Sequence, residues 1–512
     1  MKNVIRFLNI SLIAIAFLYL IFYFPEYTLV AIIGLIVALA IYDYTQPKHT
    51  ILRNFPVIGH LRYILESIGP EIRQYFVESD MDGKPLNRNQ RTYIYSRAKK
   101  ENDNHPFGTE LDLQNDNIEW VRHSMFPSLH QNTAPRVTIG GSECKQPYAA
   151  SLLNVSAMSY GSLSKNAISA LNLGAKAGGF YHNTGEGSIS DFHKLGGDIC
   201  YQVGTGYFGC RDEHGNFSEE KFTISANLPE VKLIEIKLSQ GAKPGHGGIL
   251  PASKNNEEIA RIRGVKPHTT IISPPGHTAF NSYNGLLHFV ARMRKLSNGK
   301  PIGFKLCVGN PAEFNKICLA MTETGIKPDF ITVDGAEGGT GAAPITFSDH
   351  VGMPWENALM FVSETLKKHD LKKDIKIITS GKIIDGFDLL KAISLGADVC
   401  NSARAMMLAL GCIQALECHK NTCPTGIATN NPKLMRGLVV KEKWERVKNY
   451  HEAVLEDFMG LLAATGCTTT EELNPSFIFK QIDGNSMSYE DLNEIRKSNY
   501  YLHLKTPVDK VN

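Results

Sequence analysis

Excess charge of one sign and a high cysteine content are both missing from this chain. Its 512 residues carry 54 lysines and arginines against 51 aspartates and glutamates, a net charge of +3. The sequence lacks the basic excess on which nucleic-acid binding depends, so we expect no nucleic acid among its partners. Ten cysteines are too sparse for a disulfide scaffold. The apolar content is ample for a large core, and no internal repeat or low-complexity tract is present.

Charged residues are also missing from two stretches near the amino terminus. Phe7–Phe24 is almost wholly apolar, and Leu29–Tyr42 follows after a break at Pro25. A membrane-spanning helix needs roughly 20 residues, so each stretch is slightly short, and a secretory signal is the alternative for the first. Because no small-residue cleavage site follows, the sequence favours a transmembrane helical hairpin over residues 1–47.

Basic residues flank this predicted hairpin, and a polar amino-terminal segment over residues 48–144 follows it. By the positive-inside tendency, both ends of the hairpin and everything after residue 48 are cytoplasmic. The sequence therefore predicts a membrane-anchored protein with a cytoplasmic catalytic domain. Within the polar segment, Ile51–Phe76 is suited to a short amphipathic helix near the membrane surface. The flanking basic residues are Lys2, Arg6, Lys48, Arg53 and Arg62.

From about residue 145, short apolar strands alternate with glycine-rich turns and helical stretches. The predicted strands are Ser151–Ser156, Leu233–Lys237, Thr270–Ser273, Ile302–Val308, Phe330–Asp334, Ile375–Ser380 and Asp398–Ser402. The predicted helices include Lys165–Lys176, Ala312–Thr324, Trp355–Lys368 and Phe387–Leu395. This α/β alternation, with polar residues after the strand ends, predicts a (β/α)8 TIM barrel over 145–480 and a tail over 481–512. A doubly wound sheet is the alternative, but its Gly-x-Gly-x-x-Gly turn is missing near the start of the unit.

Three small-residue turns follow consecutive predicted strands. The first is Asp334–Gly341, whose glycine amides can approach an anion or a flat ring without a side-chain clash. Thr379–Lys382 and Asn401–Arg404 end the next two strands, and barrel enzymes build phosphate sites from the loops after strands seven and eight. The candidate phosphate-binding residues are Gly338, Gly339, Gly381, Lys382, Ser402, Ala403 and Arg404.

Two further predicted strands contain a lysine within or at the end of an apolar run. Lys305 lies in the apolar run Gly-Phe-Lys-Leu-Cys; if it faces inward it needs an anionic partner, which the pyrimidine edge of a reduced flavin would supply. A lysine facing solvent at a strand end is the alternative. Lys237, Gln240 and Lys243 suit a dicarboxylate, each ammonium meeting one carboxylate, although a solvated basic loop has the same composition. His246 is either an acid–base group or a loop histidine.

Cys412, Cys418 and Cys423 form a C-x5-C-x4-C run followed by proline. An odd number of thiols in one compact loop suits an iron–sulfur cluster better than disulfides, and a 3Fe–4S cluster needs three thiolates. Zinc held with His419 is an alternative, but the adjacent ligands Cys418 and His419 would strain a tetrahedral site; three unlinked thiols are another. The other seven cysteines are expected to be reduced, buried thiols. A flavin site beside a cluster predicts a redox enzyme.

From about residue 145 to 480 the chain resembles the FMN-binding synthase domain of glutamate synthase. The amino-terminal segments resemble those of a shorter, single-domain subgroup of that family. The runs that carry the resemblance, in the same order as in the family, are Ser156–Ser164, Ile236–Gly245, Ile272–His277, Asp334–Ala343, His350–Glu356 and Cys412–Thr429.

This resemblance implies FMN and a 3Fe–4S cluster as cofactors. In the family reaction, ammonia and 2-oxoglutarate give 2-iminoglutarate, which takes a hydride from reduced FMN to become L-glutamate. The implied FMN contacts are Ala157, Met158, Ser159, Gln240 and Lys305, with the phosphate at Gly338, Gly339, Gly381, Ala403 and Arg404. The implied cluster ligands are Cys412, Cys418 and Cys423. The implied catalytic and 2-oxoglutarate residues are Lys237, Gln240 and Lys243, with Glu186 and His246 beside them.

The chain departs from the family beside the substrate. Gly245–Pro251 has His246 and Ile249 where the family has a glutamate and a glutamine, and Gly185–Ser190 keeps Glu186 but loses a second acid. Losing hydrogen-bonding groups from a polar site can change substrate choice strongly. Three functions follow: glutamate formation from 2-oxoglutarate, another amine and keto acid such as N-methylglutamate formation, or a non-catalytic electron-transfer subunit.

No glutaminase domain with an amino-terminal cysteine, and no second dinucleotide domain, is expected in this sequence. Ammonia or an amine is therefore expected from outside or from a partner. Electrons are expected from ferredoxin or another electron-donor protein.

Overall fold

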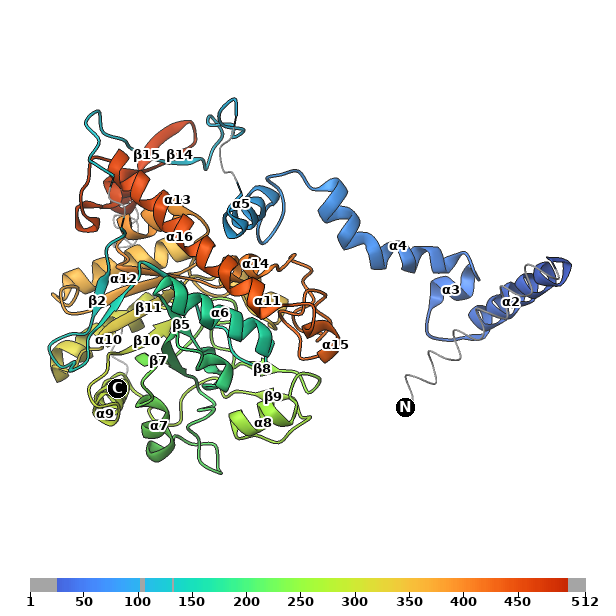
Figure 1. Cartoon of the computed structure of the whole chain (residues 1–512), viewed down its shortest axis with the longest axis horizontal. Coiled ribbons are helices and arrows are strands. Elements are labelled where there is room, and N and C mark those ends of the chain that lie inside the picture. The colour runs from blue at the N-terminus through green and yellow to red at the C-terminus, as the bar shows by residue number, and fades with distance from the viewer. Residues whose placement is uncertain (1–24, 102–105, 131–132, 496–512) are drawn as a thin grey trace, which may run out of the picture. The chain divides into compact units, whose positions relative to one another are not determined.

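The computed structural model describes residues 25–101, 106–130 and 133–495, and the chain forms two compact units, Met1–Asn89 and Gln90–Asn512 (Figure 1). The first predicted membrane segment, Phe7–Phe24, lies outside the described residues. In the first unit, helix α2 (Pro25–Thr45) is followed by α3 (Thr50–Asn54), α4 (Gly59–Ile72) and a π-helical turn, Arg73–Val77. Over Tyr27–Thr45, α2 is long and apolar enough to cross a membrane, with a mean hydropathy of 2.0; in the described part of the chain it is the one such helix.

A buried aspartate joins α2 to α4. The Asp43 carboxylate accepts hydrogen bonds from His60 Nε2 at 2.9 Å and from the backbone amide of Val57 at 2.9 Å. The predicted amphipathic stretch therefore contains two short helices and a π-helical turn rather than one helix, because the chain bends at Phe55–Ile58 between them.

The second unit contains a closed barrel of eight parallel strands. Each strand pairs with the next along the chain, and β13 closes the ring on β4 through the pair Asn401 and Asn154. This confirms the predicted (β/α)8 barrel. The strands are β4 (Leu153–Val155), β5 (Tyr181–Asn183), β6 (Asp198–Val203), β7 (Val231–Lys237), β10 (Ile302–Leu306), β11 (Phe330–Asp334), β12 (Lys376–Ser380) and β13 (Val399–Ser402).

One predicted strand was wrongly placed and two barrel strands were missed. Thr270–Ser273 contains β9 (Ile271–Ile272), which pairs antiparallel with β8 (Ile249–Leu250) in the connection after β7, outside the barrel. The missed strands are β5 and β6. The polar side chains of Asn183 and Gln202 point inward and interrupt the apolar pattern from which the other strands were predicted.

Helices surround the barrel (Figure 1). Several begin at the expected side-chain caps: the Ser164, Asn310 and Asp385 side chains each accept a hydrogen bond from a backbone amide in the first turn. The α-helices are α5 (Arg88–Lys99), α6 (Lys165–Gly178), α7 (Glu219–Ala226), α8 (Glu257–Arg263), α9 (Tyr283–Leu296), α10 (Pro311–Thr324), α11 (Ile345–His350), α12 (Trp355–Lys368), α13 (Gly386–Ser394), α14 (Arg404–Leu410), α15 (Pro432–Met435) and α16 (Val440–Ala464). Short 3-10 turns cover Gly185–Gly187, Asp191–His193, Thr470–Glu472 and Pro475–Phe477.

Small strand pairs lie outside the barrel. β1 (Glu119–Val121) pairs with β14 (Ile478–Ile482), which pairs with β15 (Asn485–Ser488). The predicted boundaries at 144/145 and 480/481 therefore fall inside the second unit. The hairpin of β2 (Val137–Ile139) and β3 (Tyr148–Ala150) packs its buried side chains against residues near the start of several barrel strands, among them Tyr181, Leu233, Phe330 and Val399. This packing fills the amino-terminal end of the barrel and leaves the carboxyl end for a site.

Candidate active site at the carboxyl end of the barrel

A buried glutamate organises the interior of the barrel. Glu235, on β7, is 1% exposed. Its carboxylate accepts hydrogen bonds from the amides of Asn183 (3.0 Å) and Gln202 (2.5 Å) and from the Thr332 hydroxyl (2.6 Å), which lie on β5, β6 and β11. Because side chains alternate along a strand, Lys237 points to the same interior, two residues nearer the carboxyl end.

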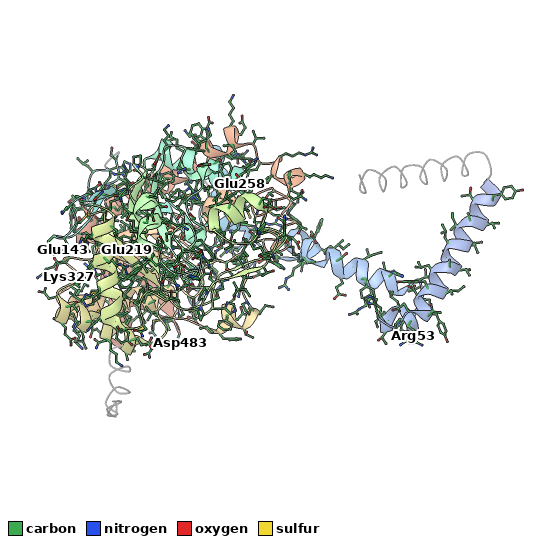
Figure 2. All side chains as sticks on the ribbon, turned by 90° about the horizontal axis from the view of Figure 1, so that it is seen from below. Arg53, Glu143, Glu219, Glu258, Lys327 and Asp483 are labelled. Atoms are coloured by element: carbon green, nitrogen blue, oxygen red, sulfur yellow. The ribbon has the colours of Figure 1, made fainter. Side chains whose placement is uncertain are left out.

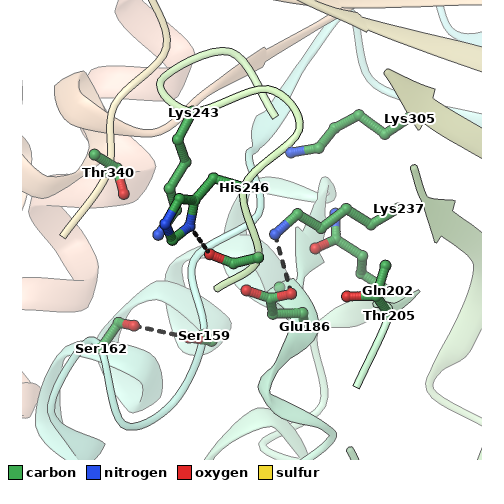
Figure 3. A network of polar contacts seen from close by, with 12 residues as sticks. Ser159, Ser162, Glu186, Gln202, Thr205, Lys237, Lys243, His246, Lys305 and Thr340 are labelled. Atoms are coloured by element: carbon green, nitrogen blue, oxygen red, sulfur yellow. Dashed lines mark hydrogen bonds and ion pairs between the residues drawn. The ribbon is translucent and has the colours of Figure 1, made fainter. Parts of the chain in front are cut away.

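Two buried ion pairs lie at this carboxyl end, and Figure 3 shows the first of them, Lys237 with Glu186, beside the side chain of Lys305. The Lys237 ammonium lies 3.0 Å from the Glu186 carboxylate, which the 3-10 turn after β5 supplies. Lys305 is the neighbour of Lys237 on the adjacent strand β10, and its ammonium lies 3.6 Å from Asp334 at the end of β11. The same aspartate accepts a hydrogen bond from the Ser380 hydroxyl at 2.6 Å. The prediction that Lys305 faces inward is confirmed.

The buried charges at this end of the barrel shift the pKa values of their neighbours. Burial alone would raise the pKa of Glu186, but Lys237 and Arg263 hold that pKa below its usual range. Burial opposes the charge on Lys305, yet the carboxylates of Asp334 and Glu235 raise its pKa overall. Burial lowers the pKa of Lys237 against the pull of Glu186. Glu186 is therefore held in its ionised form, and a further anion would meet the two buried ammonium groups of Lys237 and Lys305.

The basic turn after β7 folds over these pairs. Lys243 is 3% exposed and its ammonium donates a hydrogen bond to the Ala342 carbonyl at 2.6 Å. Burial lowers the pKa of Lys243 to about 8, with Lys237 adding to the shift. His246 Nδ1 lies 2.9 Å from the Gly247 carbonyl oxygen, and its ring makes an edge contact with Phe347. Gln240, in the same turn, is half-buried.

Two glycines make room for Glu186. A Cβ atom on Gly248 would lie 2.1 Å from Glu186 Oε1, and one on Gly204 would lie 2.8 Å from Oε2. Both backbone segments therefore approach the carboxylate as closely as glycine alone allows. The sequence contains many glycines near this turn, so the two were not singled out.

An arginine that the sequence did not single out supports the first barrel loop. Arg263, at the end of α8, is 4% exposed and stacks on the Phe208 ring at 5.1 Å. Its Nη2 donates hydrogen bonds to the Tyr160 carbonyl at 2.9 Å and to Ser159 Oγ at 3.3 Å. The loop after β4 thus reaches the site through Ser159, beside the predicted residues Ala157 and Met158.

The predicted phosphate-binding residues gather at the same end of the barrel. They follow β11, β12 and β13, which are neighbouring strands and the sixth, seventh and eighth of the barrel. Arg404 lies against Gly339, and its guanidinium donates a hydrogen bond to the Glu337 carbonyl. Gly381 is buried against Trp355, whose Cγ a Cβ atom there would meet at 2.7 Å. Gly338, Gly339 and Ala403 are partly or fully exposed, so their backbones border the open end of the barrel.

The three cysteines lie in the segment 411–431, here called the cysteine loop, which follows α14. Cys423 is buried, and Cys412 and Cys418 are half-buried. Burial and the neighbouring thiols raise the pKa of Cys412, to about 12, and of Cys418. Within the residues that the structure describes, no three His, Cys, Asp or Glu side chains converge as ligands of a single ion.

The cysteine loop is fastened to the loop after β4. The Ser164 amide donates to the Ile427 carbonyl at 2.7 Å, and the Asn430 side-chain amide donates to the Gly161 carbonyl at 2.9 Å. The predicted cluster ligands and three of the predicted flavin contacts, Ala157, Met158 and Ser159, therefore lie on two adjoining segments. Of the other seven cysteines, six are buried as expected and Cys144 is half-buried.

Comparison with known proteins assigns the chain to a family. Residues 89–468 match the family model described as the conserved region in glutamate synthase. The glutamate synthase large subunit-like protein YerD of Bacillus subtilis is 38% identical over 493 residues, which cover 88% of this chain and 93% of that protein. The chain belongs to the glutamate synthase family. It is a glutamate-synthase-like oxidoreductase.

Relatives of other lengths match a smaller share of the chain. The archaeal glutamate synthase [NADPH] of Methanocaldococcus jannaschii is 35% identical over 318 residues, 62% of this chain and 59% of that protein. The glutamate synthase [NADPH] large chain of Bacillus subtilis is 32% identical, and 20% of its length is matched. Among solved structures, a mandelate oxidase mutant aligns with 84% of this chain at 14% identity, with a TM-score of 0.43.

Proposed function

We propose that this glutamate synthase-like protein reductively aminates 2-oxoglutarate to L-glutamate with FMN and a 3Fe–4S cluster. The observation that carries the proposal is the pair of adjacent buried lysines, Lys237 and Lys305, at the carboxyl end of the barrel, with Lys243 above them. Four cationic side chains, Lys237, Lys243, Lys305 and Arg263, lie among three carboxylates, Glu186, Asp334 and Glu235. This excess of positive charge among buried groups favours anionic ligands.

The residues present fit FMN. The backbone of the half-buried Gly338 and the exposed Gly339 and the guanidinium of Arg404 suit a phosphate, at the position where barrel enzymes hold one. Lys305 brings a fixed positive charge into the interior, where it would favour the anionic form of a reduced ring. FMN, when bound, supplies a hydride to the substrate. The residues of this chain hold the phosphate, exclude water and orient the substrate carbon.

Lys237 and Lys243 would bind the two carboxylates of 2-oxoglutarate. Glu186 keeps Lys237 in place and charged, and the backbones of Gly248 and Gly204 hold Glu186. A lysine fixed by a second carboxylate loses little rotamer freedom when substrate binds, which favours one orientation of the keto carbon. Ammonia condenses with this keto group to give 2-iminoglutarate, the acceptor of the hydride.

The cysteine loop would carry the cluster on Cys412, Cys418 and Cys423. The cluster passes electrons one at a time, and ferredoxin or another electron-donor protein would deliver them. The hydrogen bonds that join this loop to the loop after β4 support a short path toward the flavin.

A second candidate keeps the cofactors and changes the amine or the keto acid. His246 packs its ring against Phe347, and Ile249 lies in β8, half-buried. This wall of the substrate turn presents a ring and an aliphatic chain, which favours an alkylamine over ammonia, as in N-methylglutamate formation.

The test supplies the reduced, reconstituted protein with 2-oxoglutarate and either ammonium or methylammonium and identifies the amino acid by mass spectrometry. Glutamate from ammonium is the expected product. N-methylglutamate alone would establish the second candidate. No product from either amine, with flavin and cluster both loaded, would contradict both and leave an electron-transfer subunit.

The first unit would anchor the protein in a membrane with the barrel in the cytoplasm. Beyond the apolar helix α2, the support is a row of exposed apolar side chains along α4 at helical spacing: Ile58, Leu61, Leu65, Ile68 and Ile72. Exposed basic residues, among them Lys48, Arg53 (Figure 2) and Arg62, lie close to α2 in the sequence. Flotation of the full chain with phospholipid vesicles is expected, and recovery of all of it at the bottom of the gradient would contradict the anchor.

A further inference from the structure

Lys254 lies where three segments of the barrel unit meet. The Ser253 carbonyl accepts a hydrogen bond from the Asn421 side chain at 2.9 Å, and the Lys254 carbonyl accepts one from Asn430 at 3.2 Å. Both asparagines belong to the cysteine loop. The Lys254 ammonium donates to the Ser162 carbonyl at 2.8 Å, in the loop after β4. Lys254 therefore joins the cysteine loop to the loop that carries Ser159.

The charge of this lysine is not matched by a carboxylate. Lys254 is 2% exposed, and among the described residues no aspartate or glutamate lies within ion-pair distance of its ammonium. A buried cation with one carbonyl partner is costly unless an anion lies near it. Burial lowers the pKa of Lys254 to about 8, and the acidic groups that raise it are the thiols of Cys418 and Cys423. Protonated thiols carry no charge. An anionic group held by these two sulfurs would therefore supply the counterion that Lys254 lacks.

We propose that Lys254 sets the reduction potential of an iron–sulfur cluster held by the cysteine loop. This inference rests on the cluster in the proposed function. Taking up one electron from the donor protein adds one negative charge to the cluster, and nothing else is consumed. A fixed ammonium in a buried, low-dielectric position stabilises that added charge and raises the potential. Lys254 is thus a positioning residue, since it contacts neither substrate nor flavin in this account.

The experiment compares four forms of the full-length, reconstituted holoprotein. Lys254→Gln removes the charge but keeps a hydrogen-bond donor for the Ser162 carbonyl, and Lys254→Arg keeps the charge. Lys300→Gln is the matched control: Lys300 is 7% exposed, donates to the Ala226 and Leu228 carbonyls, and precedes β10 at the other end of the barrel. Iron and sulfide content are measured first, and the cluster midpoint potential is then read by EPR-monitored redox titration.

The proposal predicts that Lys254→Gln lowers the equilibrium constant for one-electron reduction of the cluster about tenfold, a shift of about 59 mV to more negative potential. Lys254→Arg and Lys300→Gln should keep the wild-type potential. An unchanged potential in Lys254→Gln with full iron content would overturn the proposal, as would an equal shift in Lys300→Gln. If Lys254→Gln fails to fold, a wild-type potential in Lys254→Met with full iron content overturns it equally.

A different outcome would identify failure of the proposed function itself. If the wild-type protein takes up no iron and sulfide, the cluster assignment is wrong and this inference is overturned with it. If the wild-type protein holds a cluster and the midpoint potential is the same in Lys254→Gln, only this inference is overturned.

Discussion

Lys237 and Lys305 are direct neighbours across the β7–β10 strand pair, both buried, and each has its own carboxylate partner. Two neighbouring ammonium groups repel each other. Glu186, in the turn after β5, and Asp334, at the end of β11, offset this repulsion. Each buried lysine therefore depends on its own carboxylate as a counterion. The two ammonium groups together can bind a further anion.

Removing the carboxylate of Glu186 should destabilise the fold as well as the site. In Glu186→Gln the buried Lys237 loses its counterion, and breaking a buried pair from one side costs about 3 kcal/mol. Chemical denaturation should show that loss. The control is Glu452→Gln, which breaks an exposed pair with Lys448 and should cost about 0.5 kcal/mol. Equal stability losses in the two variants would show that the Glu186 pair is not buried in solution.

A single methyl group on Gly248 should displace Glu186. In Gly248→Ala the new Cβ would meet Glu186 Oε1 at 2.1 Å, so the carboxylate must move away from Lys237. We expect KM for the keto acid to rise at least tenfold while bound flavin stays unchanged. Gly460→Ala is the matched control: it lies in α16 with no atom within 4 Å of the new Cβ, and should be neutral or slightly stabilising. A KM for Gly248→Ala equal to that of the control would contradict the role given to this carboxylate.

The pKa of Lys243 predicts how keto-acid binding depends on pH. Burial lowers this pKa to about 8, and the ammonium form is the one that binds a carboxylate. Affinity should therefore be constant below that pKa and fall by up to about tenfold per pH unit above it. Lys243→Arg, which stays charged, should flatten the profile. Calorimetric titration of 2-oxoglutarate across this range is the measurement, and a wild-type profile identical to that of the arginine variant would contradict the assignment.

The lowered pKa of Lys243 also makes the free energy of unfolding depend on pH. Between about pH 8 and the ordinary lysine pKa of about 10.4, the unfolded chain binds a proton at Lys243 that the folded chain has released. The contribution of Lys243 to the free energy of unfolding therefore rises with pH across that window. A stability difference between wild type and Lys243→Met that does not change there would contradict the lowered pKa.

The cysteine assignment predicts which thiols hold iron. Replacing Cys412, Cys418 or Cys423 by serine should abolish stoichiometric iron and sulfide after anaerobic reconstitution. Cys318→Ser is the control, because Cys318 is buried in α10, a helix outside the cysteine loop. Full iron content in any of the three loop variants would remove that residue from the ligand set.

The sequence predicted six barrel strands from their apolar runs, although β7 and β11 also direct the polar side chains of Glu235 and Thr332 inward. It missed β5 and β6, because Asn183 and Gln202 look like turn residues until a closed barrel brings Glu235 between them. Inward Lys305 could be predicted from its apolar run. Its partner was expected to be a flavin, whereas Asp334, 29 residues later and already noted as the start of a glycine-rich turn, supplies the anion.

Long-range pairings account for the rest. Glu186 and Lys237 come from different loops and strands, and no local pattern links them. Gly248 and Gly204 matter only because that pair forms between them. In the sequence, Lys254 looks like an ordinary loop lysine. Its burial depends on contacts with Ser162 and the cysteine loop, which no local pattern predicts.

The most direct test of the central claim is a single turnover followed by visible spectroscopy. The full-length holoprotein is photoreduced without oxygen, 2-oxoglutarate and ammonium are added, and the oxidised flavin band is monitored. The account predicts that the band returns together with one glutamate per flavin. A flavin that stays bleached with both substrates present, in protein whose FMN and iron content are complete, would contradict it.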